Sequence, residues 1–170
     1  MSLTYSPPRE TDARQRIGRY RTMSGTVELG KGGFVFEKAV ANARQWKVHE
    51  RDGLLVTPKD ARVQEGSCVV LLISISVIYV TVACRVVSTF ETDTRWEFSY
   101  GTLPHHVERG EESFSIEHAS DDTVRFTVRA WSRPGHLWTS IGAPITRAVQ
   151  RKALNHYLQA MVDLVTLDTR

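Results

Sequence analysis

The chain has 170 residues, and its 22 lysines and arginines against 19 aspartates and glutamates give a formal charge of +3. Charged residues make up 24% and hydrophobic residues 41%, a globular balance that excludes a disordered or fibrous chain. Two cysteines are too few for a disulfide scaffold, and the small positive charge does not indicate a nucleic-acid partner. The length fits one domain, which we place at residues 20–170 after a polar N-terminal arm of residues 1–19.

Apolar periodicity and glycine positions predict the elements of the N-terminal half. A first strand covers Thr22 to Leu29 and ends at a glycine-rich turn, which lacks the glycine spacing of the known phosphate-binding loops. Apolar residues at helical spacing then predict a helix from about Phe34 to Gln45. Leu54 to Thr57 are expected to form a short strand, which ends at Pro58.

The uncharged stretch from Ser67 to Cys84 is close to the length of a membrane-spanning helix. However, nine of the seventeen residues from Cys68 to Cys84 are Val, Ile or Thr, which favour extended strands. We therefore expect two buried strands with a break between Ser74 and Val77, and no membrane span. The two cysteines are expected to be inert core residues, and the protein is expected to be soluble and cytoplasmic.

Alternation of apolar and polar residues predicts three strands in the second half: Trp96 to Tyr100, Phe114 to Glu117, and Val124 to Ala130. A period of two is typical of antiparallel strands with one face on the core. Because same-face residues of a hairpin lie opposite each other, Glu117 should pair with Arg125 on the outer face. The same rule predicts that Phe90 lies across from Trp96.

A long amphipathic helix closes the chain, beginning near Pro144 and carrying Tyr157 and Met161 on its apolar stripe. This order of elements predicts an α+β fold in which a curved antiparallel β-sheet wraps around the long C-terminal helix, with one shorter helix after the first strand. The arrangement is similar to the helix-grip, or START-like, fold of the birch-pollen allergen and polyketide cyclase superfamily. That resemblance implies an apolar cavity between sheet and helix.

Several motifs of the second half resemble the family catalogued as domain of unknown function 1990, which occurs in bacteria and plants and at the end of YndJ-like proteins. The motifs are CRVV from Cys84, YGTLP from Tyr100, HVERGEE from His106, SRP from Ser132 and APITRAVQ from Ala143. The likeness runs from about Leu3 to Met161 and departs from the family pattern at His105, where a glycine is expected. Because the family is uncharacterised, the resemblance implies no activity.

The segment from Tyr100 to Glu112 is the densest in polar side chains. His106 and Glu108 can point the same way, but two ligands make an incomplete metal site, so no metal or other cofactor is expected. No nucleophile elbow or other convincing catalytic motif is present. A cyclase- or hydrolase-type enzyme that uses the acidic and histidine residues of the 103–112 loop is the alternative interpretation, in which Glu112 and Arg133 are among the converging groups.

The inward aromatic residues favour a small binding module for an apolar or amphipathic small molecule, held between the sheet and the C-terminal helix. A filled core would need the same apolar lining, so an interaction or regulatory domain is a further alternative. The candidate ligand-binding residues are Trp96, Phe98, Tyr100, His106, Glu108, Phe126, Arg133, Tyr157 and Met161.

Overall fold

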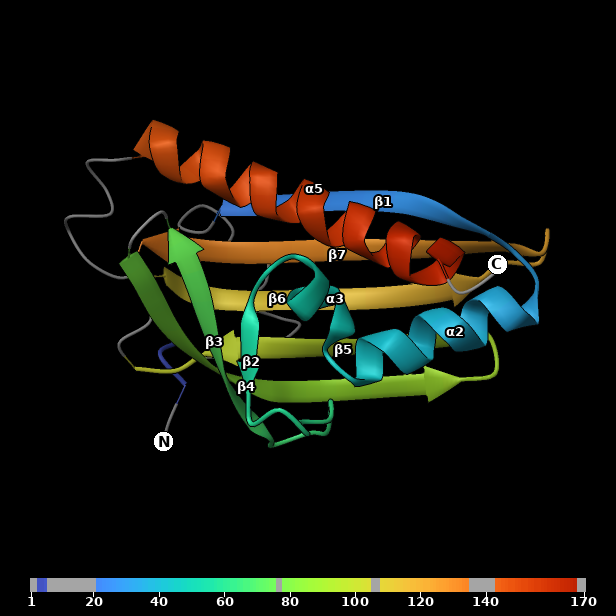
Figure 1. The fold of residues 1–170 in the computed structure, drawn as a ribbon, viewed down its shortest axis with the longest axis horizontal. Coiled ribbons are helices and arrows are strands. Elements are labelled where there is room, and N and C mark those ends of the chain that lie inside the picture. Colours follow the sequence, from blue (N-terminus) through green and yellow to red (C-terminus); the bar gives the residue numbers. More distant parts are fainter. Residues whose placement is uncertain (1–2, 6–20, 76–77, 105–107, 135–142, 168–170) are drawn as a thin grey trace, which may run out of the picture.

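A computed structural model of the chain describes residues 3–5, 21–75, 78–104, 108–134 and 143–167, and shows helices packed on one face of a curved sheet (Figure 1). Its elements are β1 (Arg21–Lys31), α2 (Gly33–Arg44), α3 (Lys47–Arg51), β2 (Leu55–Thr57), β3 (Cys68–Ile75), β4 (Ile78–Thr92), β5 (Arg95–Thr102), β6 (Glu108–His118), β7 (Thr123–Pro134) and α5 (Ala143–Leu167). The seven strands are antiparallel in the order β1-β7-β6-β5-β4-β3-β2. This arrangement confirms the predicted fold class.

The uncharged stretch forms β3 and the beginning of β4, so its interpretation as two strands is confirmed. β3 ends at Ile75 and β4 begins at Ile78, within the predicted break, while residues 76–77 lie outside the described residues. In the described part of the chain, no helix is long and apolar enough to cross a membrane. The short helix α3 was not predicted, because five residues are too few to show a helical period.

The predicted pairing of Glu117 with Arg125 is confirmed in the β6–β7 ladder. Their side chains do not form the salt bridge expected from that register, because Arg125 turns toward the hairpin loop. Its Nη2 lies 3.4 Å from Asp121 Oδ2. Glu117 also lies opposite Arg95 of β5, so acidic and basic residues alternate across the outer face.

The predicted pairing of Phe90 with Trp96 is wrong. A bulge between Val86 and Ser88 shifts the β4–β5 register by one residue, so Phe90 lies opposite Glu97. A shift of one residue moves a side chain to the other face of a sheet. Phe90 is therefore 53% exposed, while Trp96 is buried.

One of the two cysteines is not a core residue. Cys84 is buried as predicted, whereas Cys68 is exposed. Cys68 lies opposite Arg85, whose Nε donates a hydrogen bond to Cys68 Sγ at 3.5 Å. Since Arg85 follows Cys84 directly, the alternation of the strand places Arg85 and its partner Cys68 on the outward face.

Residues 3–5 of the predicted N-terminal arm pack against the outer face of the sheet. The Thr4 backbone N–H donates to the Thr102 carbonyl at 3.1 Å, and the Tyr5 hydroxyl donates to Glu111 Oε2 at 2.9 Å. A Cβ atom at Gly101 would lie 1.9 Å from the Tyr5 hydroxyl oxygen, so only glycine fits beneath this ring. The domain boundary at residue 20 stays a prediction.

Helix α5 covers the concave face and packs closely against β1 at Gly25. A Cβ atom at this glycine would lie 2.9 Å from Leu158 Cδ1 and 3.3 Å from Leu154 Cδ2. On the sheet side of the helix, Tyr157 and Met161 are buried as the apolar stripe predicts. The missing side chain at Gly25 thus sets how closely the helix can lie on the sheet.

We predict that Gly25→Val lowers the free energy of unfolding by about 1–3 kcal/mol, because the added methyl groups overpack the contact with α5. Urea unfolding followed by circular dichroism measures this change. Ser24→Val is the matched control, since it places the same side chain on the exposed face of the same strand. Equal unfolding free energies for the two variants would contradict the close contact.

Candidate functional site

Aromatic rings from three parts of the structure meet on the concave face near Tyr100. They come from the sheet, from α5 and from the junction between α2 and α3. The set consists of Trp46, His49, Phe98, Tyr100, Phe114 and Tyr157, whose neighbouring ring centroids are 4.8 to 6.1 Å apart. We call this set the ring cluster. All six side chains are buried, and rings at these separations and angles attract each other beyond their apolar burial.

The break between α2 and α3 brings Trp46 and His49 into the ring cluster. Trp46 has a φ of 60°, a left-handed conformation that costs a bulky residue on the order of 1–3 kcal/mol. The turn at this residue lets α3 lie over the middle of the sheet beside α5 (Figure 1). As a result, Trp46 is 1% exposed and His49 is 2% exposed.

A carboxyl group faces the ring cluster from the sheet. Glu112 lies directly opposite Tyr100 in the β5–β6 ladder, so both side chains are on the inner face. The Tyr100 hydroxyl donates to Glu112 Oε2, and His49 Nε2 lies 3.3 Å from the same hydroxyl. Since the Tyr100 proton is directed to Glu112, the Tyr100 oxygen accepts from His49 Nε2–H, and the lone pair of neutral His49 is on Nδ1.

Two nitrogens of the ring cluster have no hydrogen-bond partner among the described residues. They are Trp46 Nε1, which is a donor, and His49 Nδ1, which is an acceptor in this tautomer. Buried polar atoms are nearly always paired, and an unpaired one costs about 1–3 kcal/mol. The ring cluster therefore has hydrogen-bonding capacity that its own side chains do not use.

Burial drives the titratable groups of this interior toward their neutral forms. It lowers the pKa of His49 to about 3 and raises the pKa of Tyr100 and Tyr157 well above the usual value, with a further contribution from the Glu112 charge for the tyrosines. Burial also raises the pKa of the nearby Cys84 thiol. A histidine with so low a pKa is a weak base at neutral pH, so these groups are suited to hydrogen bonding more than to proton transfer.

Two polar contacts hold α3 against α5. His156 Nδ1 lies 2.8 Å from Asp52 Oδ1, and Arg51 Nη2 lies 3.6 Å from Asp163 Oδ2. Burial raises the pKa of Asp52, while the neighbouring His156 acts in the opposite direction. These contacts fix the helix that carries His49 over the sheet.

The structure brings together six of the nine predicted site residues. Trp96, Phe98, Tyr100, Phe126, Tyr157 and Met161 are all buried, and Trp96 lies under Arg44 of α2, whose guanidinium carbon is 5.8 Å from the centre of its ring. Glu108 and Arg133 lie in adjoining pairs of the β6–β7 ladder, but their side chains and all of His106 are outside the described part of the structure. Whether these residues bind a ligand stays a prediction.

The predicted loop over residues 103–112 is wrong in its second half. β6 begins at Glu108, and Gly110, which the loop prediction includes, pairs with Ser132 inside the strand. A Cβ atom at Gly110 would lie 2.0 Å from the Trp131 carbonyl oxygen, so this glycine permits close strand contact. Because Glu112 lies inside β6, its side chain is on the same face of the sheet as that of the buried Phe114, two residues later.

Sequence reasoning missed the parts of the site that come from the α2–α3 junction. The predicted helix from Phe34 to Gln45 ends one residue before Trp46, and the sequence analysis assigns no role to His49. Glu112 carried a usable signal, because it has the same parity as Phe114 and Ile116. No comparable signal marked His49, since its position depends on how α3 folds back onto the sheet.

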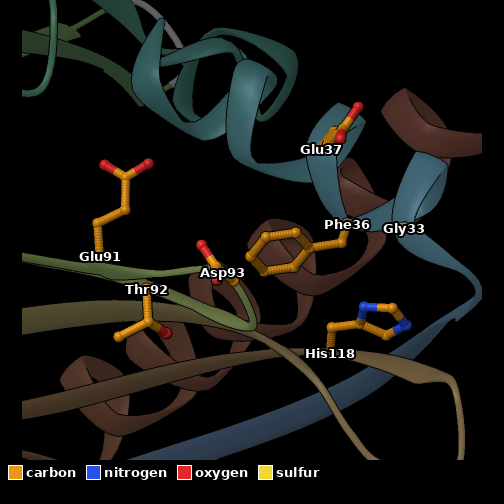
Figure 2. Close-up of a pocket in the computed structure, with 7 residues that line it drawn as sticks. All are labelled: Gly33, Phe36, Glu37, Glu91, Thr92, Asp93 and His118. Carbon is orange, nitrogen blue, oxygen red and sulfur yellow. The ribbon is translucent and has the colours of Figure 1, made fainter.

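A separate hollow of about 480 Å³ lies between α2 and the β4–β5 turn (Figure 2). It is lined by Gly33, Phe36, Glu37, Glu91, Thr92, Asp93 and His118, none of which is a predicted site residue. Figure 2 shows the Phe36 ring pointing between Asp93 and His118. Two of its polar side chains already have partners: Glu91 pairs with Arg44, and His118 Nε2 lies 2.7 Å from Asp122 Oδ1.

Comparison with known proteins gives a family and a fold. Residues 4–160 match the family described as Domain of unknown function (DUF1990). A UPF0548 protein of Deinococcus radiodurans is 30% identical over 158 residues, which cover 86% of this chain and 77% of that protein.

Two solved structures have a similar fold despite low sequence identity. The Zhui aromatase/cyclase from Streptomyces sp. R1128 matches with a TM-score of 0.64 at 11% identity, over 89% of this chain and 96% of that one. A START superfamily protein from Mycobacterium smegmatis matches with a TM-score of 0.61 at 13% identity, over 87% and 99% of the two chains. Since the identities are this low, the likeness shows the START-like fold alone.

We predict that His49 makes folding sensitive to acid. Unfolded His49 takes up a proton near pH 6.5 and folded His49 only near pH 3, so the protein loses stability as the pH falls between these values. This contribution has a slope of up to about 1.4 kcal/mol per pH unit. In His49→Gln, which has no proton to take up, urea unfolding at a series of pH values should show a shallower slope.

Val48→Ala is the control for this measurement. It removes buried side-chain volume from the same helix without removing a titratable group, so it should lower stability and keep the wild-type slope. Equal slopes in the wild type and His49→Gln would contradict a buried, neutral His49.

Proposed function

This chain belongs to the DUF1990 family, and we propose that it is a small binding module for an apolar or amphipathic small molecule. The ligand is held between the concave face of the sheet and α5. The START-like fold of the chain supports this function, because that fold places a curved apolar sheet face under one long helix.

The observation that carries the proposal is the ring cluster and its unused hydrogen-bonding atoms. Small-molecule sites are usually apolar and aromatic, with a few polar groups that orient the ligand. The ring cluster has this composition, with Trp46 Nε1 and His49 Nδ1 as the polar groups without partners. Tyr100 of the ring cluster lies two residues before β5 ends at Thr102, and we expect the mouth of the cavity near the 103–112 segment that follows, or near Arg133.

A cyclase- or hydrolase-type enzyme draws on the same interior, because Glu112 belongs to the 103–112 segment and faces inward. The pKa shifts of His49 and Tyr100 favour binding over this alternative. A histidine that stays neutral down to about pH 3 and a tyrosine that holds its proton are poorly matched to acid–base work at neutral pH. An interaction domain with a filled core is the outcome if nothing binds.

Native mass spectrometry of freshly purified protein tests the binding function. We expect a fraction of the protein to exceed its sequence mass by a discrete amount, and organic extraction to release a small molecule of that mass. Protein that carries nothing, and whose ring cluster shows no chemical-shift change with a panel of apolar compounds, would contradict the proposal and favour the filled core.

We predict that Tyr157→Ala retains at least about tenfold less of the extracted compound than Arg151→Ala, a ratio that corresponds to about 1.4 kcal/mol. Tyr157 is 6% exposed and its ring contacts His49 and Phe114, whereas Arg151 is an exposed residue of the same helix. Retention is measured by native mass spectrometry after dilution.

Tyr157→Phe accompanies this comparison, because removal of a buried aromatic side chain costs about 3–5 kcal/mol and can unfold the domain. The phenylalanine variant keeps the ring and should retain more compound than the alanine variant. Equal retention by folded Tyr157→Ala and Arg151→Ala would place the ligand away from the ring cluster.

A further inference from the structure

The ring cluster offers one donor and one acceptor that its own residues leave unused. Trp46 Nε1–H is the donor, and His49 Nδ1 is the acceptor, because Nε2–H is directed to Tyr100. The Trp46 and His49 rings are neighbours, with centroids 4.8 Å apart and an interplanar angle of 64°. Both nitrogens therefore belong to one small region of the interior.

We propose that Trp46 and His49 together recognise a hydroxyl group on a neutral ligand, an alcohol or a phenol. This inference rests on the proposed binding function and names the chemistry of its ligand. A hydroxyl accepts from the indole N–H and donates to the imidazole Nδ1, so it pairs both atoms. A ketone or an ether only accepts, and an ammonium group only donates, so each leaves one nitrogen unpaired.

The surroundings of the two nitrogens favour an uncharged ligand. An anionic group has no proton for His49 Nδ1, and it would enter a region in which Tyr100 joins His49 to the Glu112 carboxyl group. Burial already shifts the pKa of His49 down and that of Tyr157 up, which shows that this interior disfavours charge. The hydroxyl end of an amphipathic molecule enters such a region at a lower desolvation cost than a charged end does.

A matched set of small aromatic probes tests the inference: naphthol, its methyl ether and naphthoate, all substituted at the same ring position. The full chain labelled with ¹⁵N gives an indole N–H signal for each of its four tryptophans, and Trp46→Phe assigns one of them to Trp46. We expect naphthol to move the Trp46 signal and to bind about five- to tenfold more tightly than its methyl ether, the effect of one net hydrogen bond. Naphthoate should bind more weakly than naphthol.

Two variants show whether this preference comes from the proposed contacts. His49→Leu keeps an apolar side chain in the ring cluster but has no hydrogen-bond acceptor, so the ratio between naphthol and its ether should fall toward one. Trp46→Phe should weaken naphthol and ether alike, because both accept from the indole. Trp131→Phe is the matched control, since it removes an indole that contacts Tyr5 on the outer face of the sheet and should leave the affinity for both compounds unchanged.

The outcomes separate this inference from the proposed function. If naphthol binds and its preference over the ether is the same in the wild type and His49→Leu, the hydroxyl assignment is overturned while the binding module stands. An unchanged Trp46 signal at saturating naphthol also overturns the assignment. If neither naphthol nor its ether binds, the assignment is overturned, and the compounds extracted from the purified protein decide the binding function on their own.

Discussion

Burial of the concave face of the sheet is the constraint on which the rest of the structure depends. The inner residues at its centre, Phe98, Phe114, Phe126 and Val128, are 0 to 1% exposed, and such a face is stable only when another layer covers it. In the described residues, α5 is the longest helix, and Gly25 lets it lie close to β1. α2 and α3 cover the part of the face that α5 leaves uncovered. This covering role explains why the fold includes a helix of only five residues.

The same covering layer brings polar groups into an apolar interior. α3 places His49 above Tyr100 and Phe114, and the sheet itself contributes Glu112 on its inner face. In this setting burial sets the chemistry of each group, because it favours the neutral imidazole and the protonated phenols. The interior therefore combines an apolar lining with hydrogen-bonding atoms that carry no charge.

The fold of this chain is shared by many proteins, whereas the atoms that line its interior are particular to this sequence. A START-like fold requires a pattern of apolar and polar positions, which many sequences satisfy, and this chain has the fold at 11% identity to an aromatase/cyclase. The chemistry of a ligand depends on which atoms the inner face presents. In this chain those atoms are the Trp46 and His49 ring nitrogens and the Tyr100–Glu112 pair, which indicate the chemistry of a ligand more directly than the fold does.

The sequence by itself determined the elements with a clear period: the strands of the second half, the pairing of Glu117 with Arg125, and the buried stripe of α5 at Tyr157. These follow from local sterics and alternation, which act over a few residues. Only the tertiary structure decided the β4–β5 register, because the bulge moves Phe90 to the outer face of β4, where strict alternation would not place it. It also decided the place of His49, since that side chain becomes part of the interior through long-range packing of α3 against α5, which no local pattern encodes.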